Sequence, residues 1–445
     1  MLNRFNLGQA PQTLNAVVLD DNEQQHAVSM TMECFAEVET ISGELSRATD
    51  IALGLENLEF VTRNVSGSKN TDLAFIDTAV GLAVAGSDVS TEELLPSLES
   101  NDDGTISTEA IKNIAKSVWD AIKNAVLKMW RKIAEFWKWL TDSVPGVRKA
   151  AVKLRDRAEA SVGKSTDKSK VELGREIFTL SVDENAPSSG SDIASGLGKL
   201  LEVTNAVYNE YAKGVVEAGV EQAGIIDKFR VDTKANAELD IQALIAASEM
   251  GTAISAVSRV VKDAVGADTR FVDTKDMKKV DLLGNESLFL TSRHITAGRT
   301  VLEQAAASRK IRLELKNTKQ KPGKAKESGS ISIITPEEVI GMADSIIELC
   351  DGIIEYNKSS NFKKAEDAGD KMKKATDGLE STYKSASKDE DFDNEIKPYY
   401  NSALSFNTAF VRLNGSTQLS LTKHVVAVSR AAMTACSKSL SLHKD

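Results

Sequence analysis

The chain has 445 residues, more than one hydrophobic core usually serves, so we expect two or three domains. Its 41% hydrophobic and 27% charged residues exclude a disordered chain, and only seven prolines favour long helices over a sandwich or barrel. The net charge of -10 is unevenly spread, since residues 1–107 hold 18 acidic and 4 basic side chains, whereas residues 108–175 hold 8 acidic and 16 basic ones.

Cysteines and apolar runs place further limits on the class of protein. The chain has three cysteines, an odd number, and they lie far apart at Cys34, Cys350 and Cys436. We therefore expect neither a disulfide framework nor a zinc site, and we expect the protein to work in a reducing compartment. No continuous apolar segment follows Met1, so a signal peptide is not expected. No run approaches the roughly 18 apolar residues that a membrane-spanning helix needs.

The acidic N-terminal part is predicted to be helical. Apolar residues recur at three- and four-residue steps in Asp21–Val65, and a second apolar helix is expected over Leu73–Ala85. The capping-box sequence Ser90-Thr91-Glu92-Glu93 predicts a short third helix. Pro96 and the polar run Ser97–Gly104 then indicate an exposed connection. We therefore treat residues 1–99 as one acidic helical leader.

A basic, tryptophan-rich amphipathic helix is predicted over Thr108–Thr141. Its apolar stripe is Ile111, Ile114, Val118, Ile122, Val126, Met129, Ile133, Phe136 and Leu140. Beside and opposite it lie the candidate interaction residues Trp119, Lys123, Lys128, Trp130, Arg131, Lys132, Trp137 and Trp139. Three interpretations stay open: a core helix with a solvated basic face, a helix that lies on a membrane surface, or a helix that contacts phosphate backbones.

After this helix, Val144-Pro145-Gly146 predicts a break, followed by a short basic helix over Val147–Ala160 and the linker Ser161–Lys170. Residues 100–175 thus form a basic helical segment. Residues 176–335 are expected to be an α+β body and residues 336–445 a C-terminal helical bundle. The predicted fold class is mainly α with a small antiparallel β region.

The elements of the α+β body are predicted from local patterns. Strands are expected at Glu176–Val182, Ile311–Leu315 and Ile331–Ile334, and long helices at Ser191–Phe229 and Ala235–Val265. A hairpin is expected from Val280 to Ser292, because its Gly284-Asn285 turn supplies positive φ cheaply. Thr335-Pro336-Glu337-Glu338 marks the start of the C-terminal helices.

Two loops imitate ligand-binding motifs, and both fail a positional test. Gly163-Lys164-Ser165-Thr166 resembles the end of a phosphate-binding loop, but Ala158 stands where the first glycine should be. Asn101–Ser107 resembles a calcium loop, but Glu109 falls one residue before the closing ligand position. The four histidines are scattered, and no nucleophile or paired-carboxylate motif is present. We therefore predict no catalytic residues, no metal and no cofactor, hence a protein that is not an enzyme.

The arrangement resembles the internal head proteins (prohead core or inner-body proteins) of large, giant-type tailed myophages. The resemblance is carried by the acidic leader ending in Leu94–Ser100, by the helix from Glu109 to Trp137, and by a partly β body with the turn Leu283-Gly284-Asn285. It implies a structural protein of the capsid interior, present in the host cytoplasm before assembly. The implied partners are the major capsid shell, other core proteins, a prohead protease and packaged DNA.

In that family a maturation protease cuts after a small or apolar residue, any residue, and a glutamate. Ser97-Leu98-Glu99 fits this pattern and lies in the predicted exposed connection, so cleavage between Glu99 and Ser100 is expected. Residues 1–99 carry 16 acidic and 4 basic side chains, so their loss changes the net charge from -10 to +2. We hypothesise that the leader masks the basic helices until cleavage. The alternative is a membrane-active or ejection protein that uses residues 108–141.

Overall fold

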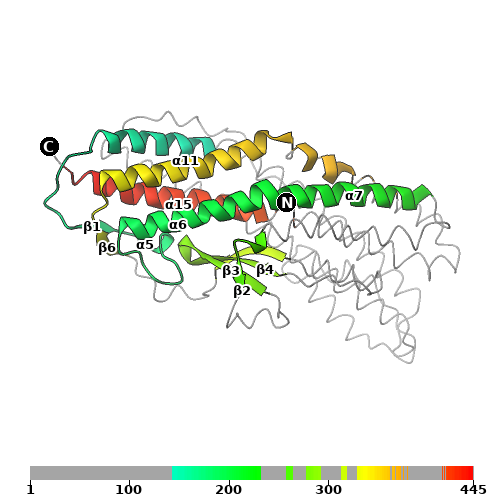
Figure 1. The fold of residues 1–445 in the computed structure, drawn as a ribbon, viewed down its shortest axis with the longest axis horizontal. Helices are drawn as coiled ribbons and strands as arrows, with labels where there is room; N and C mark the ends of the chain where they lie inside the picture. The colour runs from blue at the N-terminus through cyan, green and yellow to red at the C-terminus, as the bar shows by residue number, and fades with distance from the viewer. Residues whose placement is uncertain are drawn as a thin grey trace, which may run out of the picture.

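The computed structural model describes residues 143–231, 257–263, 277–291, 312–317, 328–360, most of 363–371, residues 374, 378, 413 and 415, and 417–443. Residues 143–159 are helical and are called the 143–159 helix below. Figure 1 shows this helix, α11 (Pro336–Lys358) and α15 (Thr417–Leu440) lying alongside one long rod made of α6 (Gly190–Asn205), η1 (Ala206–Tyr211) and α7 (Ala212–Val231). The described part is therefore a bundle of long helices.

Two antiparallel sheets accompany the bundle. The larger sheet has the strand order β2 (Lys262–Asp263), β3 (Met277–Leu282), β4 (Glu286–Thr291) and β5 (Arg312–Asn317), with η3 (Leu283–Asn285) as the turn between β3 and β4. The smaller sheet pairs β1 (Lys170–Leu173) with β6 (Gly329–Ser332). The prediction of a mainly α protein with a small antiparallel β region is confirmed.

The helices pack through apolar stripes with helical spacing. The stripe on α11 is Val339, Met342, Ala343, Ile346, Leu349, Cys350, Ile353 and Tyr356, and all of these residues are buried. The 143–159 helix buries Val144, Val147, Ala151, Leu154 and Ala158. All of these residues except Ala343 belong to one hydrophobic core that also includes β-strand and α15 residues such as Leu288 and Val428. The core thus joins segments on both sides of residue 335.

Helices α6 and α11 run side by side in the same direction. A Cβ atom built on Gly190, at the start of α6, would lie 3.1 Å from Oε2 of Glu338, at the start of α11. A Cβ atom built on Gly352, near the end of α11, would lie 3.4 Å from Oδ1 of Asn205, at the end of α6. Both helices begin with a capping box, formed by Ser189 with Asp192 and by Thr335 with Glu338. The predicted helix start at Thr335–Glu338 is confirmed.

The hairpin prediction is also confirmed. Leu282 pairs with Glu286 at the end of β3 and β4, and Gly284 and Asn285 have φ values of 80° and 56°. The predicted strand Ile311–Leu315 is observed as β5, and Ile331–Ile334 as β6 shifted toward the N-terminus by two residues. The predicted helix Ser191–Phe229 is observed as α6, η1 and α7.

Three local predictions are wrong. Glu176–Val182 contains the one-turn helix α5 (Glu176–Thr179) rather than a strand, because Ile177 and Leu180 are buried at a helical spacing of three residues. Val144-Pro145-Gly146 does not precede the short basic helix but lies in the first turn of the 143–159 helix as described, where proline is tolerated; the residues before 143 lie outside the described part. The expected helix Ala235–Val265 does not include Lys262–Asp263, which pair with β3 as β2.

Candidate functional site

The sequence-predicted site residues lie outside the described part of the chain. This holds for the cleavage residues Ser97–Ser100 and for the candidate interaction residues of the tryptophan-rich helix, from Trp119 to Trp139. The structure therefore describes the body that follows them. Its best-defined polar features are an ion-pair interface on the 143–159 helix, a buried tyrosine cluster and the Leu283–Asn285 turn.

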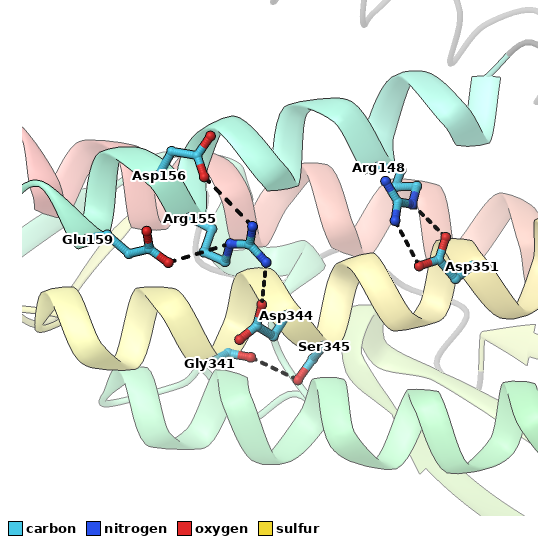
Figure 2. Close-up of polar contacts among 8 residues, drawn as sticks. All are labelled: Arg148, Arg155, Asp156, Glu159, Gly341, Asp344, Ser345 and Asp351. Atoms are coloured by element: carbon cyan, nitrogen blue, oxygen red, sulfur yellow. Dashed lines mark hydrogen bonds and ion pairs between the residues drawn. The ribbon is translucent and has the colours of Figure 1, made fainter.

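The 143–159 helix is tied to α11 by a two-pronged ion pair. Arg148 donates from Nε to Asp351 Oδ1 at 2.5 Å and from Nη2 to Asp351 Oδ2 at 3.1 Å, as Figure 2 shows. This fork geometry is the strong form of a guanidinium–carboxylate contact. The hydrogen bond to Asp351 raises the pKa of Arg148 above its usual value. Both side chains remain about 40% exposed (41% and 39%), so water weakens the pair.

A second arginine repeats this arrangement one heptad later. Arg155 Nη1 lies 3.5 Å from Asp344 Oδ1 on α11, while its other nitrogens lie 3.8 Å from Asp156 and 3.7 Å from Glu159 (Figure 2). From Arg148 to Arg155 the number rises by seven, and from Asp351 to Asp344 it falls by seven. The two helices are therefore antiparallel and packed in a heptad register, which places both arginines on the same edge of the interface.

The last turns of α15 connect three other segments of the bundle. Arg157 donates to Ser437 Oγ at 3.0 Å, Lys438 Nζ donates to Glu176 Oε1 at 3.0 Å, and Ser439 Oγ both accepts from Ile334 N and donates to Ile334 O. Burial opposes ionisation of Glu176, but its hydrogen bonds, including the one from Lys438, prevail and lower the pKa of this carboxyl. Three consecutive residues thus fix the 143–159 helix, α5 and the start of α11.

A buried tyrosine cluster lies where the long rod changes its helical geometry. η1 is a π-helical turn, and it directs both Tyr208 and Tyr211 into the core. The Tyr208 hydroxyl contacts Gln418 O at 3.0 Å and the Thr422 hydroxyl, and its ring packs edge-on against Tyr356 at 5.1 Å between ring centres. Burial raises the pKa of the Tyr356 hydroxyl to about 12. The cluster fixes the register of α15 against the rod and α11.

Helix η3, the turn between β3 and β4, is inserted between α5, the loop after it and α15. Asn285 is buried, donates from Nδ2 to Phe178 O at 3.3 Å and accepts at Oδ1 from Glu184 N at 2.8 Å. Its main-chain N–H donates to Ser181 O at 3.0 Å. Sequence reasoning identified this turn as a hairpin signal, but not as the point that attaches the sheet to the helices.

The described residues include no cluster of three or more His, Cys, Asp or Glu side chains that could hold a metal ion. Among the same residues, no helix is long and apolar enough to cross a membrane. Cys350 and Cys436 are buried thiols, and burial raises the pKa of each to about 12. Thiols held in the neutral form are poor nucleophiles, so both act as core residues.

These features define a class of helical structural protein, in which the polar groups serve mainly to fix one helix against another. Residues 24–438 match the family described as phiKZ-like phage internal head proteins, and the chain belongs to that family. It is therefore a structural protein of the phage head, located inside the virion capsid, and the suspected family is confirmed. No curated protein and no solved structure matches the chain.

Proposed function

We propose that the chain is made as a precursor, assembles with the core proteins and capsid shell in the host cytoplasm, and is cut after Glu99 by the prohead protease. The product, Ser100–Asp445, is then packaged with DNA. The observation that carries the proposal is the charge contrast: residues 1–99 hold 16 acidic and 4 basic side chains, and residues 100–445 hold 49 and 51. A chain of net charge +2 is repelled less by the phosphates of densely packed DNA than a chain of net charge -10.

The contacts of the body support a cut at this position. The 143–159 helix is fixed to α11 through Arg148 and Arg155, and to α15 through Arg157. All of these partners follow residue 99 in the sequence, so cleavage there removes none of these ion pairs or hydrogen bonds. The leader can therefore be lost while this part of the bundle stays intact.

The same contacts reduce the positive charge that the 143–159 helix can offer to DNA. Arg148 and Arg155 are each engaged with carboxylates of α11, so they contribute little net positive field. Residues 108–142 hold seven basic and four acidic side chains. We propose that contact with DNA, which is non-specific, depends on this upstream segment, including Lys123, Lys128, Arg131 and Lys132.

N-terminal mapping of the protein recovered from finished particles tests the cleavage. We expect a first residue of Ser100 in the wild type and an unprocessed chain in Glu99→Gln. Glu56→Gln is the matched control, because Gly54-Leu55-Glu56 has the same pattern but lies in a predicted helix. An intact Met1 in mature virions, or normal processing of Glu99→Gln, would contradict the proposal.

Binding to a random-sequence DNA duplex tests the masking by the leader. At low salt we expect the Ser100–Asp445 product to bind more tightly than the intact chain, with an affinity that falls steeply as salt is added. Equal affinities would show that the leader masks nothing, even if cleavage occurs. Binding of the product to anionic vesicles rather than to DNA would instead favour the membrane-active alternative.

A further inference from the structure

A buried histidine lies against the tip of the β3–β4 hairpin. His424 on α15 is 6% exposed, and the position of a Cβ on Gly284 lies 3.0 Å from its Cε1 atom. Because Gly284 has a φ of 80° and no side chain, the turn can approach the imidazole this closely. The hairpin tip and the histidine ring thus form one tightly packed contact between the larger sheet and α15.

Burial lowers the pKa of His424 by more than a hydrogen bond with the main chain of Leu283 raises it, so the polar surroundings only partly support a charged imidazole. Its Nδ1 atom lies 3.6 Å from Glu286 Oε2 at the start of β4, and its buried Nε2 atom has no hydrogen-bond partner among the described residues. The turn itself, Leu283-Gly284-Asn285, contributes no titratable side chain. An imidazolium at this position would bury an N–H donor without an acceptor, which is costly.

We propose that protonation of His424 releases the Leu283–Asn285 turn from α15, so that acid loosens the contact between the larger sheet and the helical bundle. This inference is independent of the cleavage and of DNA binding. It concerns a conformational response of the body itself.

Glu286 becomes a weaker partner for the protonated histidine as the pH falls. Burial lowers the pKa of His424 to about 4, whereas burial raises the pKa of Glu286 above its usual value despite the charge of Lys423. The raised pKa of Glu286 favours its neutral carboxylic acid as the pH falls. The carboxyl oxygen 3.6 Å from Nδ1 of His424 then offers less negative charge to an imidazolium.

Two acidic groups on the elements packed around this contact are engaged elsewhere. Glu176 of α5 pairs with Lys438, and Glu314 of β5 pairs with Lys316 at 2.7 Å. The register places Glu314 opposite Phe289, on the face of the sheet opposite that of Leu288 and Glu286. Lys423 is the neighbouring cation on α15, and its charge lowers the pKa of Glu286 without overcoming the effect of burial.

The sign of the pH effect follows from linkage. A histidine titrating at about 4 when folded and at 6.5 when unfolded binds fewer protons in the folded state, so its contribution to stability is lost as the pH falls below 6.5. Between pH 7.5 and pH 5 this single group shifts the unfolding equilibrium roughly thirty-fold toward the unfolded state. Glu286 acts in the opposite direction, because its raised pKa favours the folded state in acid.

Urea denaturation of the full chain at pH 7.5 and pH 5 tests the proposal with three variants. His424→Gln is expected to lose less stability on acidification than the wild type. Between pH 7.5 and pH 5, its unfolding equilibrium constant should rise about thirty-fold less than that of the wild type. Glu286→Gln is expected to lose more, because the opposing group is gone. His443→Gln is the matched control, since it removes a histidine from the end of the chain, and it should follow the wild type.

Hydrogen exchange locates the response. After correction for the intrinsic effect of pH on exchange, peptides covering Leu282–Leu290 should lose protection at pH 5 in the wild type and keep it in His424→Gln. The paired core residues of β1 and β6 should stay protected in both. If His424→Gln and wild type lose equal stability, if Glu286→Gln is no more acid-sensitive, or if the hairpin peptides are unchanged by pH, the proposal is wrong. Should His424→Gln fail to fold, Glu286→Gln and the exchange data still decide.

Discussion

Two glycines of α6, only two residues apart, should respond oppositely to the same substitution. Gly196 faces the hairpin turn, and a Cβ placed on it would lie 2.6 Å from both Cγ and Cδ2 of Leu283. Gly198 has nothing within 4 Å of the corresponding position. Gly196→Ala and Gly198→Ala therefore form a matched pair in one helix, in which helix propensity is constant and only the contact with the turn differs.

The magnitudes follow from two opposing terms. Alanine is favoured over glycine in a helix interior by about 1 kcal/mol, so Gly198→Ala should raise the free energy of unfolding by up to about that amount. At Gly196 the same gain is opposed by overpacking, because 2.6 Å is far inside carbon–carbon contact and Leu283 is buried. Overpacking costs about 1–3 kcal/mol, so the two variants should differ by that amount.

Urea denaturation monitored by circular dichroism measures both variants under identical conditions. In a Leu283→Ala background the clashing atoms are absent, so Gly196→Ala should become as favourable as Gly198→Ala. This double-mutant cycle separates the clash from any general effect on α6. If Gly196→Ala stabilises the wild-type chain as much as Gly198→Ala does, the close packing of the turn on α6 is refuted.

Three further substitutions test individual contacts. Asn285→Ala should cost about 1–3 kcal/mol in urea denaturation, because the buried Asn285 side chain loses the hydrogen bond it accepts from Glu184 N–H and the one it donates to Phe178 O; an unchanged stability would contradict the anchoring role of the turn. Thr335→Ala should cost about 1 kcal/mol by removing the N-cap of α11, measured by thermal unfolding, and no change would contradict the capping box. Asp351→Asn should cost at most about 1 kcal/mol, with the difference from wild type shrinking in high salt, because the pair with Arg148 is half exposed.

Elements with strong local signals could be predicted from the sequence. Gly284-Asn285 indicates a hairpin because two successive residues must adopt positive φ, and both do. Thr335-Pro336-Glu337-Glu338 indicates a helix start because its side chains satisfy the first main-chain N–H groups, as the capping box shows. In both cases the determining interactions lie within a few residues, so no tertiary contact was needed to predict them.

Elements that depend on distant partners could not be predicted. β1 pairs Lys170 with Ser332, and four residues with two buried side chains give too short a pattern to distinguish from a linker. The apolar run after it was wrongly predicted as a strand, since short apolar runs suit either structure until their packing is known. The π-helical turn at Tyr208 is not predicted for a similar reason, because Tyr208 packs against α11 and α15, which lie far away in the sequence.

The ion pairs also change what the charge of residues 100–175 means. Residues 108–142 hold seven basic and four acidic side chains, and residues 143–175 hold nine and four, so the second part is the more basic by count. In the fold, however, Arg148 and Arg155 are matched with aspartates of α11 that lie 203 and 189 residues away in the sequence. The number of cations in this part of the sequence therefore overstates the positive electrostatic field of the folded protein, because packing against α11 places aspartates beside two of the arginines. Counting Asp344 and Asp351 lowers the net charge of residues 143–175 from +5 to +3, which equals the +3 of residues 108–142, so the charge count no longer favours the second part as the contact with DNA.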